Sequence, residues 1–215
     1  MTLNPLDVPD VTEPYQPRTG QRGTGFLTGP FRLGETPSAT VGPYLAIGLT
    51  WPDGAWAAAE GTPGGVWIRG QVFDGAGDVV PDAMVETWQA DADGRFDHPD
   101  DPRRAVAGFR GFGRSSTDAN GGYGILTMKP GVVSAPDGSP HAPHIDVSVF
   151  ARGLLKRVIT RIYFADEQDA NASDPVLSQV SDSGRRSTLI AEPTDDGYRF
   201  DIRLQGERET VFFEL

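Results

Sequence analysis

Glycine and proline divide this sequence into short segments, and their spacing constrains the fold more than any other feature. The chain has 27 glycines and 18 prolines among 215 residues. Beyond Gly65 they recur about every ten residues, an interval that suits short strands joined by turns better than helices. Turn dipeptides such as Asp74-Gly75 mark where a strand ends and a hairpin begins. The sequence therefore predicts an all-β fold.

The segments between these turns are rich in residues that favour strands. His144–Phe150 alternates apolar Ile145, Val147 and Val149 with polar residues, as a half-buried strand does. One short helix is expected at Asp174–Leu177, where an N-cap residue precedes a proline. About eight short strands with little helix favour an antiparallel β-sandwich. The other predicted strands are Val66–Phe73, Met84–Gln89, Tyr123–Met128, Val158–Phe164, Tyr198–Leu204 and Thr210–Phe213.

The chain divides into two regions by composition. Residues 1–34 are rich in proline and glycine and poor in aliphatic side chains, which predicts an extended N-terminal arm. Residues 35–215 contain every predicted strand. Because all-β domains of this size are common, we expect them to form one domain.

The composition excludes several classes of function. A net charge of −11 and an isoelectric point near 4.6 argue against a nucleic-acid partner, because an acidic surface repels phosphate. The absence of cysteine excludes a disulfide scaffold and thiolate metal sites. No apolar stretch approaches the roughly 20 residues of a membrane helix, and the N-terminus lacks a signal-peptide pattern. We therefore expect a cytoplasmic protein with no membrane partner.

Three local patterns look like ligand-binding motifs and are better explained as turns or loops. The segment 91–94 lacks the remaining acidic positions of a calcium loop. The segment 111–113 lacks the third glycine and the following helix of a dinucleotide site. Arg185 and Arg186 stand in a turn rich in serine, aspartate and glycine, where a solvated or ion-paired loop is the commoner case. None of these patterns predicts a ligand.

His144 and Asp146 form the one pattern that suits a metal. Residues two apart in a strand point to the same side, so an imidazole and a carboxylate could bind a metal from one face. His98 or His141 could supply a third ligand. A histidine on a strand is more often exposed or hydrogen-bonded, however, and two ligands do not make a site. From spacing alone, the interpretation without a metal is preferred.

Six segments follow one another in an order that carries a family resemblance: Thr36–Tyr44, Val85–Ala90, Met128–Gly131, Ala142–Ile145, Phe150–Gly153 and Thr210–Phe213. Each is a weak signal alone, whereas the ordered set is specific. Together they resemble the intradiol aromatic-ring dioxygenase family, and in particular the α chains of its two-subunit members. The resemblance covers residues 35–215.

The resemblance implies an iron site that this chain lacks. In that family the catalytic chain holds Fe(III) through two tyrosines and two histidines, with the histidines two residues apart in a strand. Here His144 matches the first histidine and Asp146 replaces the second. Val132 and Val133 stand where one tyrosine is expected, and residues 97–113 contain no tyrosine. Since ferric iron needs anionic oxygen donors, the resemblance implies that a partner β subunit holds the Fe(III) and that this chain has no catalytic residue of its own.

The resemblance also implies a role in binding substrate. In the family, the residues that match Thr40, Gly42, Pro43, Tyr44 and Arg152 border a cavity between the two chains. An arginine there suits protocatechuate, an aromatic carboxylate, and the implied reaction is its O2-dependent cleavage to 3-carboxy-cis,cis-muconate. Alternatively, residues 42–44 form only a rigid turn and Arg152 only an interface ion pair. A non-catalytic β-sandwich binding or structural module is the remaining alternative.

Overall fold

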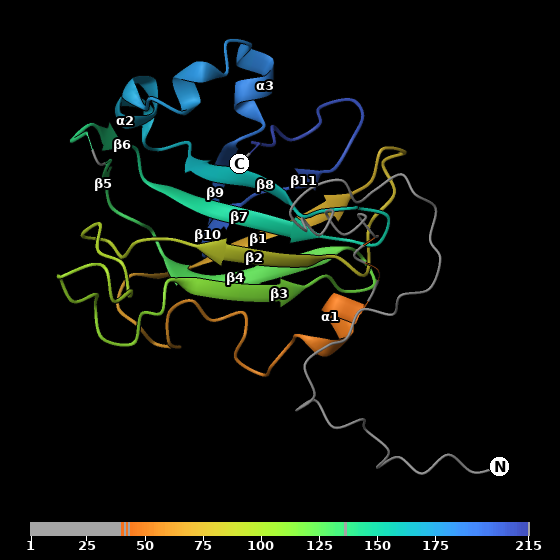
Figure 1. Ribbon diagram of the computed structural model, residues 1–215, viewed down its shortest axis with the longest axis horizontal. Coiled ribbons are helices and arrows are strands. Elements are labelled where there is room, and N and C mark those ends of the chain that lie inside the picture. The colour runs from red at the N-terminus through yellow and green to blue at the C-terminus, as the bar shows by residue number, and fades with distance from the viewer. Residues whose placement is uncertain (1–39, 41, 43, 136, 215) are drawn as a thin grey trace, which may run out of the picture. The chain divides into compact units, whose positions relative to one another are not determined.

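Short strands make up most of the fold in the computed structural model (Figure 1), which describes residues 40, 42, 44–135 and 137–214. The predicted arm, residues 1–34, lies outside the described residues, and so do its boundary with the domain and Pro43. The described part is all-β with little helix, which confirms the predicted class. The strands are β1 (Gly65–Phe73), β2 (Met84–Trp88), β3 (Phe112–Ser116), β4 (Gly122–Met128), β5 (Val133–Ser134), β6 (Pro140–His141), β7 (His144–Phe150), β8 (Val158–Phe164), β9 (Ile190–Thr194), β10 (Gly197–Arg199) and β11 (Ile202–Arg203).

Nine of these strands form one strongly curved sheet in the order β11-β1-β10-β9-β8-β7-β2-β3, with β4 paired to β1. Most neighbours are antiparallel, as predicted, but β1 runs parallel to β10 and β11, and β8 runs parallel to β9. A parallel pair needs a crossover connection. Between β8 and β9 that crossover contains α2 (Gln168–Ser173), the 3-10 helix η1 (Leu177–Gln179) and α3 (Ser183–Ser187).

The main core lies inside the curved sheet. Ile145, Val147 and Val149 of β7 are at most 1% exposed, which confirms the alternation predicted for this strand. A second, smaller cluster around Tyr163 and Leu177 lies under the crossover. The remaining helix, α1 (Tyr44–Gly48), precedes the first strand. No helix in the described part of the chain has the length and apolar character needed to cross a membrane.

The predicted strand at Tyr198–Leu204 is interrupted, and the prediction of one continuous strand was wrong. A Cβ on Gly70 of β1 would lie 1.7 Å from the carbonyl oxygen of Phe200, so glycine alone lets that carbonyl enter the sheet. Next to it, Asp201 Oδ1 accepts a hydrogen bond from the Gln71 amide at 3.1 Å. A side-chain oxygen therefore replaces a backbone acceptor at this point, and the ladder breaks into β10 and β11.

The predicted strand at Thr210–Phe213 is also absent. The Thr210 amide donates to the Arg203 carbonyl at 3.0 Å, whereas the Phe213 amide donates to the Ile159 carbonyl at 2.8 Å. The segment thus crosses from one strand to another and forms only an isolated bridge between Phe213 and Ile159. β3 and β9 were not predicted either, because their apolar residues do not alternate.

Candidate functional site

The candidate residues lie at two opposite ends of the antiparallel strands β2 and β7 (Figure 1). His144 and Asp146 are near the first residue of β7, and Arg152 follows its last residue, Phe150. At 3.3 to 3.4 Å per residue, β7 alone separates these ends by roughly 20 Å. The side chains that match the iron ligands and those that match the substrate contacts therefore do not form one site within this chain.

At the end of β7 that leads to Arg152, a tight turn presents this side chain to solvent. The Leu154 amide donates to the Ala151 carbonyl at 3.2 Å, and Gly153 has a φ of +87°, which type II turns require at their third residue. The Arg152 side chain is 64% exposed, and its Nε lies 3.1 Å from an oxygen of Asp82. The Phe-Ala-Arg-Gly segment is therefore a turn that displays a cation.

The structure brings Thr40 to the same turn. Its Oγ1 accepts a hydrogen bond from the Gly153 amide at 2.9 Å, so residues far apart in sequence become neighbours. Gly42 has a φ of +65°, which explains glycine at this position, although a Cβ there would meet no atom within 4 Å. Tyr44 begins α1 and is 79% exposed. Both Tyr44 and Arg152 are thus accessible in the isolated chain.

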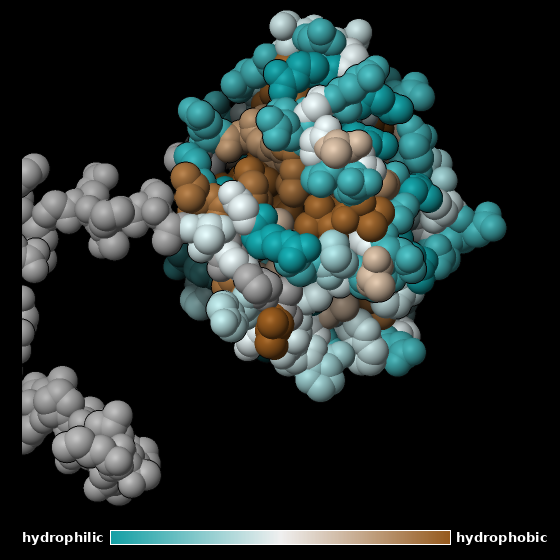
Figure 2. All heavy atoms as spheres, turned by 90° about the vertical axis from the view of Figure 1, so that its right-hand side faces the viewer, coloured by the Kyte–Doolittle hydropathy of each residue, from teal (hydrophilic) through white to brown (hydrophobic). Residues whose placement is uncertain are grey.

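Apolar side chains gather on the surface at this end of the molecule, as Figure 2 shows for the face on the right of Figure 1. Segments at this end supply four of the exposed large hydrophobic residues, namely Tyr44, Ile47, Val79 and Leu155. Exposed apolar patches of this kind commonly mark interaction sites. Arg152 therefore stands beside a surface suited to a protein partner.

At the opposite end of β7, where the strand begins, His144 and Asp146 already have partners within the chain. His144 is 8% exposed, and its Nδ1 lies 2.7 Å from the carbonyl oxygen of Ala142. Asp146 Oδ1 accepts a hydrogen bond from Arg161 Nε at 2.8 Å. Within the described ranges, no three His, Asp or Glu side chains are arranged to hold a metal ion. The alternative ligand set with His98 or His141 is therefore not brought together.

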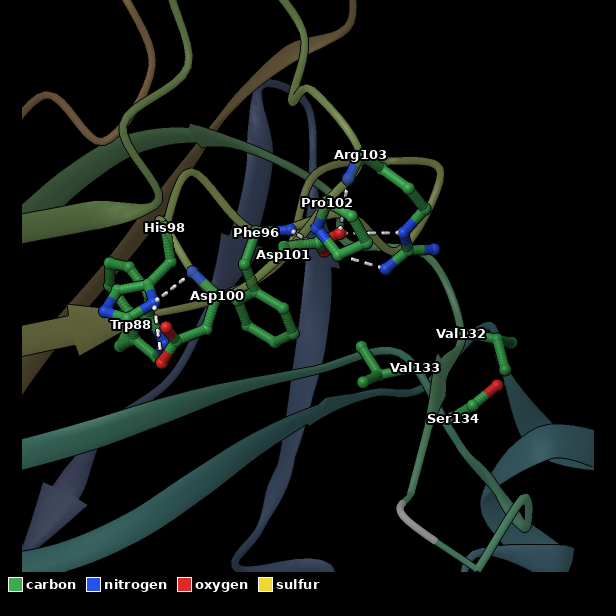
Figure 3. A pocket seen from close by; sticks show the side chains of 10 residues that line it. All are labelled: Trp88, Phe96, His98, Asp100, Asp101, Pro102, Arg103, Val132, Val133 and Ser134. Carbon is green, nitrogen blue, oxygen red and sulfur yellow. Dashed lines mark hydrogen bonds and ion pairs between the residues drawn. The ribbon is translucent and has the colours of Figure 1, made fainter.

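The two segments that the resemblance assigns to ligand tyrosines do meet in the structure. They line a pocket of about 700 Å³, with Phe96, His98 and Asp101 on one side and Val132 and Val133 on the other (Figure 3). Asp101 is hydrogen-bonded to Arg103, which holds the pKa of that carboxyl far below its usual range. No tyrosine lines this pocket. Its side chains do not fit a four-ligand ferric site, because the phenolate donors are replaced by apolar or ion-paired groups.

Two segments singled out in the sequence, Val85–Ala90 and residues 91–94, have structural roles. Gln89 of the Val85–Ala90 segment donates from Nε2 to the Met128 carbonyl at 2.8 Å and accepts from Thr127 Oγ1 at 2.8 Å. The carboxylate of Asp91 accepts hydrogen bonds from the backbone amides of Asp93, Arg95 and Val106. This network supports the interpretation of residues 91–94 as a turn.

Sequence reasoning gave no role to Asp82 and recognised Asp174 only as a helix cap. Asp174 is fully buried, and its carboxylate accepts hydrogen bonds from the amides of Ala142, Val176 and Leu177 and from the Tyr163 hydroxyl. The predicted helix at Asp174–Leu177 is instead the 3-10 helix Leu177–Gln179, whose N-cap residue is Val176; Asp174 holds the turn that leads into it and also joins the crossover to the start of β7. A short-range signal cannot reveal this second role, because the partners are distant in sequence.

Burial of His144 leads to a prediction about stability and pH. Burial, followed by the positive charge of Arg161, lowers the pKa of His144 below its usual 6.5, although Asp146 and Asp174 act in the opposite direction. Because protonation is easier in the unfolded chain, stability should be full above pH 6.5 and decline as pH falls below it. His144→Asn should flatten this decline in thermal unfolding measured from pH 7.5 to 5. An unchanged slope would contradict the assignment to His144.

Comparisons with known proteins agree with the family resemblance found in the sequence. The Dioxygenase family model matches residues 42–206. The chain is 46% identical to the protocatechuate 3,4-dioxygenase alpha chain of Pseudomonas putida, with 85% of this chain and 98% of that protein covered. It is 36% identical to the protocatechuate 3,4-dioxygenase beta chain of Burkholderia cepacia, with 72% of this chain and 71% of that protein covered. Among solved structures, catechol 1,2-dioxygenase from Pseudomonas arvilla C-1 superposes with a TM-score of 0.52 at 24% identity, covering 70% of this chain and 55% of that one, which shows the shared fold.

Proposed function

Because this chain belongs to the intradiol ring-cleaving dioxygenase family, we propose that it is the non-iron α subunit of a protocatechuate 3,4-dioxygenase. It would join an iron-bearing β chain in the O2-dependent cleavage of protocatechuate to 3-carboxy-cis,cis-muconate. The coverage of 98% of two curated alpha chains, at 46% and 45% identity, supports this assignment over the general family activity. The Fe(III) supplied by the β chain would make the bound catechol reactive toward oxygen.

The position of Arg152 is the observation that carries this proposal. Arg152 lies at the end of β7 remote from His144 and from the pocket that Val133 lines, so it cannot contact a substrate bound there. A cavity bordered by Arg152 would therefore be completed by another chain. The exposed apolar residues at the same end of the molecule, which include Ile47 and Leu155, would supply a surface on which such a chain can dock.

The chemistry of this surface suits an aromatic carboxylate. A guanidinium binds a carboxylate through paired, charge-assisted hydrogen bonds, and the partner chain would exclude water from them. Thr40 already fixes the turn beside Arg152 through Gly153. Gly42, Pro43 and Tyr44 continue from Thr40 along the chain and would complete this side of the cavity. In this arrangement the chain binds and orients the substrate, while the β chain carries the reactive centre.

Co-expression with a β chain that carries both tyrosines and both histidines tests the proposal. Ring cleavage of protocatechuate and bound iron should appear in the complex, whereas this chain purified alone should contain no stoichiometric iron and show no activity. If the complex forms but this chain adds nothing to activity or substrate affinity, the structural-module alternative is correct. If this chain alone binds iron and cleaves catechols, the ligand argument for His144 and Asp146 is wrong.

A further inference from the structure

Asp82 and Arg152 face each other across the ends of two neighbouring strands. In the antiparallel register of β2 and β7, Met84 pairs with Phe150. Continuing that register by two residues places Asp82 opposite Arg152, and the structure has Arg152 Nε 3.1 Å from Asp82 Oδ2. Both residues lie in turns just outside the paired strands, so the alignment of β2 with β7 brings these two turns side by side.

The backbone next to Asp82 is held in place. Thr117, just after β3, accepts a hydrogen bond from the Ala83 amide at 2.9 Å and donates one to the Val80 carbonyl at 2.7 Å, both through Oγ1. Ala83 is fully buried. Asp82 thus projects from a segment that Thr117 holds on both sides, whereas Arg152 projects from an exposed turn.

The Asp82 carboxylate has few other sources of stabilisation. Its side chain is 19% exposed, and both of its oxygens are buried without a hydrogen-bond partner in the described part of the chain. A buried carboxylate without donors is costly unless an opposite charge lies close to it. Arg152 is the cation that compensates it, so the guanidinium is attracted to one fixed place.

We propose that Asp82 is a positioning residue for Arg152 in substrate binding, an inference that rests on the proposed function. The contact engages the Nε edge of the guanidinium and leaves its two terminal NH2 groups without a partner among the described residues. Those two groups have the spacing that a carboxylate accepts. Asp82 thereby reduces the rotational freedom of Arg152 before protocatechuate binds, and less entropy is lost on binding.

The test compares variants in the complex with the β chain. Asp82→Asn keeps the size of the side chain and removes its charge, so it should raise the KM for protocatechuate several-fold, because the guanidinium loses the opposite charge that holds it in place. The value of kcat should change by less than about twofold, because the reacting atoms are not touched. Inhibition by catechol, which lacks the carboxylate, should be unchanged. Asp82→Ser serves the same comparison if the amide prevents assembly.

Two further variants separate the possible failures. Asp82→Asn combined with Arg152→Ala should be no worse than Arg152→Ala alone, because a positioning residue has no effect once its target is absent. Asp196→Asn, which removes the acid of the Arg69–Asp196 ion pair, is the matched control and should leave KM unchanged. If Arg152→Ala raises KM but Asp82→Asn does not, or if their effects add, the positioning inference is overturned. If Arg152→Ala itself leaves KM unchanged, the proposed role of Arg152 fails first.

Discussion

Arg152→Ala in the assembled complex should lower kcat/KM for protocatechuate about 100-fold, mainly through KM, because the two charge-assisted hydrogen bonds proposed between Arg152 and the substrate carboxylate would be lost. The substrate would still reach the β-chain iron, so kcat should fall less than KM rises. Steady-state rates for protocatechuate, together with inhibition by catechol, measure the effect. Catechol binding should be nearly unaffected, since it has no carboxylate for Arg152 to bind.

Arg199→Ala is the matched control for Arg152→Ala. Arg199 is 56% exposed and paired with Asp201 at 3.0 Å, so its exposure and its ion pair resemble those of Arg152. It lies on β10, away from the turn that follows β7. If both variants raise the KM for protocatechuate equally, the effect arises from the loss of positive charge and not from a specific contact, and the proposed role of Arg152 is wrong.

Asp174→Ala should destabilise the chain more than any other substitution proposed for it. The change leaves three backbone amides and the Tyr163 hydroxyl without their shared acceptor inside the protein. The expected cost is about 3 to 5 kcal/mol, because buried donors lose hydrogen bonds that water cannot replace. For a chain of this size that corresponds to a decrease in melting temperature of about 10 °C. Thermal and urea unfolding of the purified chain measure it.

Asp118→Ala provides the comparison for Asp174→Ala. Asp118 also accepts two backbone hydrogen bonds, from Asn120 and Gly122 at 2.8 Å each, but it is exposed. Water can satisfy its partners after substitution, so the loss should be about 1 kcal/mol or less. Equal losses for the two variants would show that burial of Asp174 contributes nothing.

The pH dependence of stability supplies a second check on Asp174. Burial acts to raise the pKa of this carboxyl, but the backbone hydrogen bonds outweigh it and lower the pKa below the usual 3.8. The contribution of Asp174 to stability should therefore be lost only as pH falls below 3.8.

The amino-acid sequence was sufficient to predict the fold class and most of the strands. β7 and β8 begin and end at the predicted residues, because alternating or continuous apolar runs between turn residues depend on local chemistry. The interrupted strand at Tyr198–Leu204 was not predictable in this way. Its break depends on the contact of Gly70 with Phe200, and no local pattern reveals a contact between residues 130 positions apart.

The candidate site also has features that the sequence predicts and features that only the tertiary structure decides. Through the family resemblance, the sequence predicted substrate contacts at Thr40, Gly42, Pro43, Tyr44 and Arg152, and it predicted no iron site at His144, because donor types can be read from residue identities. The predicted strand His144–Phe150 already separates His144 from Arg152, whereas only the tertiary structure brought Thr40 to Gly153. Only the register of β2 against β7 put Asp82 opposite Arg152. Residue identity determines which chemistry is available, whereas strand pairing decides which of those groups can act together.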